Sequence, residues 1–252
     1  MGLRPLDLAQ WLEVDEHRDE ELALKSDLLA NTPEVVVATR REGEEASTEL
    51  YHEVLVWLDA YAPTLVEPVP RGDEHPVVAA ARLVQEDLCV MVRDEVWRLQ
   101  AACVCFPSRW SLATKIGRSL DEIHAPIPGY DQVLAGPTNA VFDRLRPDRG
   151  FWRLNWTVID SPALHQPDAP RELPPDDIDQ WFFRVERQTI RRLPLTQAVV
   201  FTIHNYVSPV AALRQQPEFL EHLLLGIEGA PPAMQEYKGW LGVAQRLREA
   251  IG

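Results

Sequence analysis

Lysine is scarce in this chain of 252 residues: Lys25, Lys115 and Lys238 are the only three, and arginine supplies the rest of its 25 basic side chains. Lys115 and Lys238 are either surface charges or functional cations. Acidic residues number 39, so the formal net charge is -14 and the pI is about 4.9. Such a surface repels phosphate groups, which excludes nucleic acids and anionic membranes as expected partners.

Cysteine is also rare, with Cys89, Cys103 and Cys105 as the full set. An odd, low count, without a basic-then-apolar N-terminus, favours a reducing cytoplasm. The absence of C-x-x-C-H excludes covalently attached c-type haem, and the spacings fit neither zinc nor a cysteine-ligated iron–sulfur cluster. Cys103 and Cys105 would share one face of a strand, where core packing is the main interpretation and a thiolate ligand the alternative.

Long apolar runs and glycine-rich phosphate motifs are missing too. No stretch approaches the roughly 20 apolar residues that cross a bilayer. G-x-G-x-x-G, G-x-x-x-x-G-K-[ST] and G-x-S-x-G are absent, so the standard nucleotide-binding and serine-hydrolase functions are not favoured.

The pattern of apolar residues predicts an α+β fold in a single domain. Helical periodicity covers 1–62, including RPLDLAQWLEV, and 63–76 is a proline-rich connector. Strand-like segments follow at 88–93, 96–106, 151–160, 181–193 and 198–207, with short helices expected between the second and third. This order matches a PAS-like antiparallel five-stranded sheet (77–207), with an N-terminal helical extension (1–76) and C-terminal helices (208–252), including 216–229 and 232–251. A proline-rich loop separates the third and fourth strands, at 161–180.

The stretch VCFPSRWSLATKIGRSLDEIHAPIPGY (104–130) contains several local signals. Ser108 is expected to cap a short helix, which Gly117 ends in a left-handed conformation. Ser119 and Glu122 form a predicted capping box for the next helix, and the prolines at 126 and 128 end it. His124 is therefore held at the end of a short helix, as an axial metal ligand or as a histidine that caps the last carbonyl groups.

The strand expected at 181–193 is unusually polar. Alternation places one set of side chains on one face (Arg184, Glu186, Gln188 and Ile190) and a second set on the other (Val185, Arg187, Thr189 and Arg191). Charged side chains inside a sheet need a ligand or a partner, so this strand either lines a pocket or carries ion pairs on a solvated face. In 151–160, Arg153 and Asn155 share a face, and the other face (Trp152, Leu154 and Trp156) is expected in the core. His204 is the second candidate for a metal ligand.

Several of these motifs occur together and in order: FPSRWSLATKIG, IHAPIPGY, RLNW, VERQTIRRLP, AVVFTI and YKG. With this series the chain resembles the haem-dependent oxidative N-demethylase α-subunit-like family over roughly residues 10–240. The resemblance implies a PAS-derived fold around noncovalent haem b. It also implies oxygen activation, oxidative demethylation of a small secondary or tertiary amine with release of formaldehyde, and electrons from a reduced nicotinamide cofactor through a partner flavoprotein or ferredoxin-like reductase.

The resemblance makes His124 the leading iron ligand and implies a cofactor site formed by a further set of residues (Lys115, Tyr130, Arg153 and Trp156). Glu186 or Arg187 is then expected to bind the amine or to steer protons. An arginine-rich segment of the polar strand is expected to form a basic patch for the electron donor (Arg184, Arg187, Arg191 and Arg192). Two alternatives stay open: a haem-binding PAS-type gas or redox sensor without turnover, and N-hydroxylation or another amine oxidation on the same scaffold.

Overall fold

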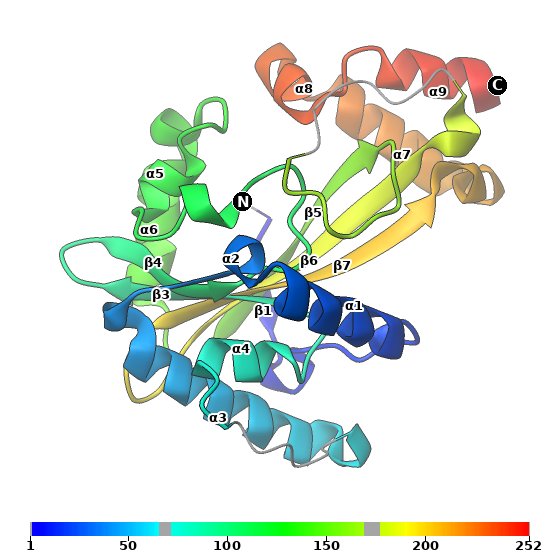
Figure 1. Ribbon diagram of the computed structural model, residues 1–252. Helices are drawn as coiled ribbons and strands as arrows, with labels where there is room; N and C mark the ends of the chain where they lie inside the picture. The colour runs from blue at the N-terminus through cyan, green and yellow to red at the C-terminus, as the bar shows by residue number, and fades with distance from the viewer. Residues whose placement is uncertain (1, 66–71, 169–176, 252) are drawn as a thin grey trace.

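Strand-forming segments meet in one antiparallel sheet at the centre of the computed structural model, which describes residues 2–65, 72–168 and 177–251 (Figure 1). Within these ranges the sheet has seven strands in the order β1-β5-β6-β7-β3-β4-β2. Their bounds are β1 Arg4–Leu6, β2 Val37–Thr39, β3 Asp87–Arg93, β4 Trp97–Cys103, β5 Gly150–Ile159, β6 Phe182–Arg192 and β7 Val199–Pro209.

The α+β class is confirmed, and each of the five expected strands is present. The sheet is nevertheless larger than expected, because two further strands bring the count in the described residues to seven. Three-residue strands β1 and β2 extend the two edges, by pairing with β5 and β4 respectively. The first replaces the helix expected over RPLDLAQWLEV. Pro5 lacks a backbone N–H, which suits an edge strand. So short a strand has no periodicity of its own, and pairing with the long strand β5 determines its conformation.

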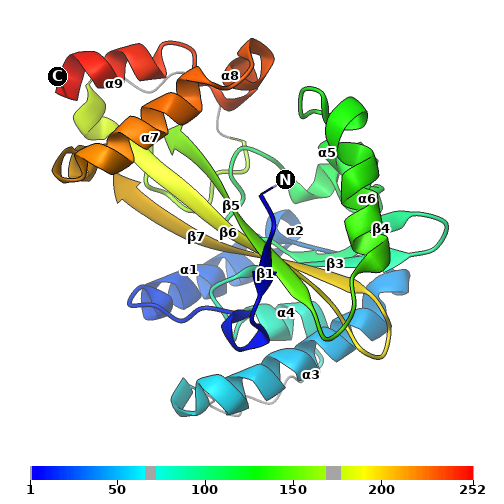
Figure 2. The same cartoon turned by 180° about the vertical axis from the view of Figure 1, so that it is seen from behind.

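Helices cover both faces of the sheet and one end of it (Figures 1 and 2). One face lies against α1, α3 and α4, the other against α5 and α6, and α7–α9 pack on the far ends of β5 to β7. The bounds are α1 Arg18–Asn31, α2 Pro33–Val36, α3 Glu44–Tyr61, α4 Pro76–Ala81, α5 Leu120–His124, α6 Ala135–Arg144, α7 Pro217–Glu228, α8 Pro232–Lys238 and α9 Val243–Ile251. None of the described helices is both long and apolar enough to cross a membrane.

The two faces of the sheet are named here by what covers them. The N-terminal face carries Arg187, Arg191 and His204. Its core includes Trp11 from the chain before α1, Leu50 from α3 and Val90 from β3. The insert face carries Arg153, Glu186 and Gln188. Its apolar part is a separate cluster in which α5 and α6 pack on β3, β4 and β7.

Turn residues explain several of the helix boundaries. Gly117 adopts a φ of 74°, which confirms the expected left-handed turn, and a Cβ there would lie 2.4 Å from Cζ of Arg40. Ser108 caps no helix but forms an isolated bridge with Gln166. The helix expected over 232–251 is two helices, α8 and α9, because Gly239 and Gly242 take φ values of 68° and 78° between them. Of the connector 63–76 and the loop 161–180, residues 66–71 and 169–176 lie outside the described ranges.

Candidate functional site

His124 is held at the C-terminus of α5 by local bonds. The capping box at the start of this helix is confirmed, since Ser119 Oγ accepts from the amide of Glu122 at 3.2 Å and Glu122 Oε2 accepts from the amide of Ser119 at 2.7 Å. His124 Nδ1 lies 2.7 Å from the carbonyl oxygen of Leu120, one turn earlier. A carbonyl can only accept, so Nδ1 carries the proton and Nε2 keeps a lone pair. The ring also stacks on buried Tyr130, with centroids 4.9 Å apart.

Two cations lie near this imidazole. Burial lowers the pKa of His124, the bond to Leu120 opposes that shift, and the positive charges of Arg153 and Lys115 lower the pKa further. The ring is therefore neutral at neutral pH, the form in which histidine binds metals. Lys115 Nζ is fixed by donating to the carbonyl oxygen of Ile123 at 2.7 Å. Three of the expected cofactor residues thus gather near His124 on the insert face: Lys115, Tyr130 and Arg153.

A chain of polar side chains crosses the insert face and converges on Glu186. Oε2 of Glu186 accepts from Asn155 Nδ2 at 3.0 Å and from Gln188 Nε2 at 2.8 Å. Arg153 Nε donates to Gln188 Oε1 at 2.8 Å, and Lys238 Nζ donates to Asn155 Oδ1 at 2.9 Å. The network joins β5, β6 and the end of α8, and with them the RLNW, VERQ and YKG motifs. From the described residues, no hydrogen bond reaches the other carboxylate oxygen, Oε1.

Beside Glu186 lies a buried donor that protein atoms do not satisfy. Asn205 of β7 pairs in register with Glu186 and is 4% exposed. Its Oδ1 accepts from Arg184 Nη2 at 2.8 Å, but neither its Nδ2 nor Arg184 Nε has a hydrogen-bond partner among the described residues. A buried donor without an acceptor costs about 1–3 kcal/mol. Water or a bound ligand is the expected acceptor at this point.

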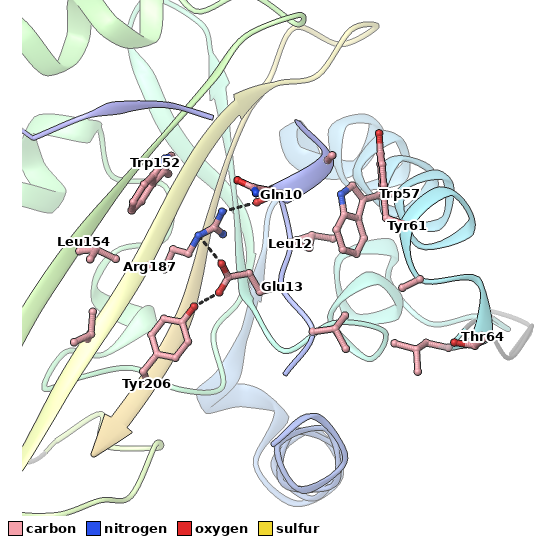
Figure 3. A pocket seen from close by; sticks show the side chains of 15 residues that line it. Gln10, Leu12, Glu13, Trp57, Tyr61, Thr64, Trp152, Leu154, Arg187 and Tyr206 are labelled. Atoms are coloured by element: carbon pink, nitrogen blue, oxygen red, sulfur yellow. Dashed lines mark hydrogen bonds and ion pairs between the residues drawn. The ribbon is translucent and has the colours of Figure 1, made fainter. Parts of the chain in front are cut away.

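Arg187 lies on the N-terminal face, opposite Glu186, and its contacts are with the chain just before α1 (Figure 3). Its Nε is 2.9 Å from Glu13 Oε1, and its other nitrogens donate to the carbonyl oxygens of Gln10 and Trp11. The other Glu13 oxygen accepts from Tyr206. An open groove of about 990 Å³ runs past these side chains, walled by Trp57, Tyr61, Trp152 and Leu154. Both oxygens of the groove's one described carboxylate are thus engaged within the protein.

His204, the second ligand candidate, lies on the same face as Arg187. It is 1% exposed, with Nε2 at 3.1 Å from Asp15 and Nδ1 at 3.4 Å from Glu86. Burial alone would lower the pKa of His204, but the contacts with Glu86 and Asp15 outweigh it and raise the pKa to about 9. A protonated imidazole between two carboxylates has no lone pair for iron, so this histidine fits an ion-pair role.

Other expected positions lie elsewhere. Trp156 stacks on Trp240 with ring centroids 4.5 Å apart, in the cluster formed with α7 and α9 and away from the group around His124. Leu154 is 52% exposed, so its expected place in the core is wrong. The expected basic docking patch is also wrong, because three of its four arginines are buried, at 1% for Arg184 and 7% for both Arg187 and Arg191.

The structure therefore divides the expected site residues between the two faces. The insert face brings together His124, Lys115, Tyr130, Arg153 and Glu186, whereas Arg187 and Trp156 contact other parts of the molecule. The motifs contained Gln188, Asn155 and Lys238, but nothing in the sequence indicated that they share hydrogen bonds. Asn205 had no signal except its place in an expected strand.

The fold and the site together describe an α+β protein with an antiparallel sheet, whose insert face places a neutral histidine near two cations and a carboxylate. In the described ranges, no three His, Cys, Asp or Glu side chains gather in a way that could hold a bare metal ion. Iron within a porphyrin needs only one or two protein ligands. A family model described as "Haem-dependent oxidative N-demethylase, alpha subunit-like" matches residues 2–67 and 62–248. The chain belongs to this family, whose name indicates haem dependence and an oxidative enzyme.

Proposed function

We propose that the chain is a haem-dependent oxygenase that removes a methyl group from a small secondary or tertiary amine, with haem b bound on the insert face. The observation that carries this proposal is the state of His124. Its Nδ1–H donates a hydrogen bond to the carbonyl oxygen of Leu120, and its lowered pKa keeps the ring neutral. Histidine ligands of metals typically donate their second ring N–H to a carbonyl or carboxylate in this way.

The residues around His124 fit the other parts of a haem group. Haem b carries two propionate carboxylates, and Lys115 and Arg153 supply two positive charges close to His124. Tyr130 supports the imidazole by stacking on it. We further propose a PAS-derived core, because α5 and α6 are inserted between the second and third of the five central strands. The division into 1–76, 77–207 and 208–252 belongs to the same proposal.

When bound, haem supplies the oxygen chemistry. The overall reaction places one oxygen atom in formaldehyde and the other in water, so it consumes two electrons and two protons for each methyl group removed. Glu186 is the proposed amine-binding residue: its Oε2 is held by two amides, which leaves Oε1 for the ammonium form of the substrate. Asn205 Nδ2, which has no acceptor among the described residues, is proposed to donate a hydrogen bond to the substrate. Proton delivery by Glu186 is part of the same role.

Electrons must come from outside the chain under this proposal. The sequence contains no glycine-rich turn of the dinucleotide-binding kind. A partner flavoprotein or ferredoxin-like reductase is therefore the proposed route from a reduced nicotinamide cofactor. Stopped-flow mixing of the anaerobic ferric protein with the reduced cofactor should give no fast reduction until a reductase is added. Fast reduction without the reductase would contradict this part of the proposal.

The test of the function is amine-dependent oxygen consumption by the haem-loaded chain with an electron donor. Formaldehyde should appear in a one-to-one ratio with the demethylated amine. Haem binding with no amine-dependent turnover would favour the sensor. Turnover that yields a hydroxylamine and no formaldehyde would favour N-hydroxylation. The Glu186→Gln variant is the matched control, since it keeps the size of the side chain and removes the charge.

A further inference from the structure

Two neutral amides hold Glu186, and each of them is oriented by a cation. Arg153 donates to the oxygen of Gln188, whose nitrogen donates to Glu186; Lys238 donates to the oxygen of Asn155, whose nitrogen donates to the same Oε2. Lysine and arginine can only donate and an ionised carboxylate can only accept. An amide between a cation and a carboxylate therefore has one favourable orientation. A flip would place its NH₂ against the cation and its oxygen against the carboxylate.

Two hydrogen-bonded arms thus reach Glu186, one from Arg153 through Gln188 and one from Lys238 through Asn155. Only the arm from Lys238 connects the sheet to a helix. Arg153 and Gln188 lie on neighbouring strands of the sheet, whereas Lys238 is the last residue of α8. Its ammonium donates to Asn155 Oδ1 and to the carbonyl oxygen of Trp156 at 3.1 Å, both in β5, and lies 5.5 Å from the centroid of the Trp240 ring, two residues beyond α8. Gly239, with a φ of 68°, ends α8 directly after this lysine.

We propose that Lys238 is a positioning residue, through which the C-terminal helices fix the amide of Asn155 and thereby hold Glu186 Oε1 toward the amine. This inference rests on the proposed function for the identity of the ligand, but not for the existence of the arm. The Asn155 orientation is a property of the protein itself. Without the ammonium, the amide of Asn155 can rotate and Glu186 loses one of its two donors and part of its fixed geometry.

The first experiment reads the amide directly and does not depend on catalysis. The side-chain NH₂ signals of Asn155 and Gln188 are assigned by ¹⁵N NMR with the Asn155→Leu and Gln188→Leu variants. Any bound haem is kept in the diamagnetic ferrous carbonyl form. In Lys238→Met the Asn155 signals should shift strongly and those of Gln188, which donates to the same Glu186 oxygen, only slightly. Lys238→Arg should restore the Asn155 signals in part. Unchanged Asn155 signals in Lys238→Met would overturn the proposal.

The second experiment separates positioning from a merely structural role by a double-mutant cycle, with trimethylammonium chloride as the calorimetric probe. Lys238→Met should weaken binding about tenfold, but less than twofold when Asn155 is already leucine, because both changes break the same arm. Equal losses in both backgrounds would show that Lys238 acts only through folding. Arg248→Met is the matched control: it removes a cation from α9 that pairs with Glu228 at 2.8 Å and should leave binding unchanged. A wild-type chain that does not bind the probe would contradict the proposed amine site, while the NMR result would still decide the role of Lys238.

Discussion

Glu186 and Arg187 are consecutive in β6, so their side chains lie on opposite faces of the sheet, and they belong to different networks. Glu186 accepts hydrogen bonds from Asn155 and Gln188 on the insert face. Arg187 binds Glu13 and the carbonyl oxygens of the chain before α1 on the N-terminal face. Substitutions at these two neighbours should therefore have different consequences.

Glu186→Gln should keep the fold and the haem but lose function. The neutral amide keeps the shape of the side chain and removes the charge that binds an ammonium. We expect amine-dependent oxygen consumption to fall at least tenfold, with thermal stability and the ferric visible spectrum unchanged. A variant that retains its turnover would show that the polar network only stabilises the sheet.

Arg187→Ala should act on stability instead. It leaves Glu13 without its cation and two carbonyl groups without a donor, in a region where Arg187 itself is 7% exposed. Loss of one partner of a buried pair costs about 3–5 kcal/mol, and the partial exposure of Glu13 reduces that to about 2–4 kcal/mol. Urea unfolding measures the change, and Arg248→Ala on the surface of α9 should cost under about 0.5 kcal/mol. A normal stability with lost turnover would place Arg187 in the catalytic site after all.

His204 should make the fold sensitive to alkaline pH. Its pKa is raised from 6.5 to about 9 in the folded protein. A raised pKa means that the folded state binds the proton more tightly, so this stabilisation is fully present below pH 6.5 and is lost as the pH rises through about 9. The loss is on the order of 3 kcal/mol. Urea midpoints across this range should fall less steeply in His204→Gln than in the wild type, and exposed His222→Gln is the control. An equal fall of the urea midpoint with pH in His204→Gln and in the wild type would contradict a charged His204.

The three cysteines should be dispensable for haem binding. All of them are buried. Burial raises the pKa of Cys89, and the side-chain contact with Cys105 together with burial raises the pKa of Cys103. A thiol reagent should react with them only after unfolding, and the Cys103→Ala/Cys105→Ala variant should keep the wild-type ferric spectrum. A changed spectrum would restore the thiolate alternative.

The sequence predicted those parts of the fold that leave a local signal. The long strands follow from segments rich in apolar and β-branched residues, and the capping box of Ser119 and Glu122 follows from the spacing of its residues; the structure confirms both. The short edge strand Arg4–Leu6 has no such signal, since it exists only through its pairing with β5. The division of 232–251 into α8 and α9 depends on two glycines whose positive φ values could not be assigned without the tertiary fold.

The candidate site was predictable as a set of residues but not as an arrangement. Alternation shows that Glu186 and Arg187 face opposite ways, but which face meets the inserted helices depends on packing. Lys238 is 83 residues from Asn155 along the chain, and only the folded structure shows that the two side chains touch. The burial of Arg184, Arg187 and Arg191, which were expected on the surface, was equally hard to predict, because their partners come from distant segments of the chain.

The central claim, that His124 holds haem iron on the insert face, is tested most directly by imidazole rescue of His124→Gly. The variant should lose the wild-type ferric visible spectrum and most of its haem, because the only protein ligand proposed for the iron is gone. Added imidazole should restore both the haem content and a histidine-type spectrum, since it supplies the missing ligand. An unchanged spectrum and full haem retention in His124→Gly without imidazole would contradict the assignment of His124.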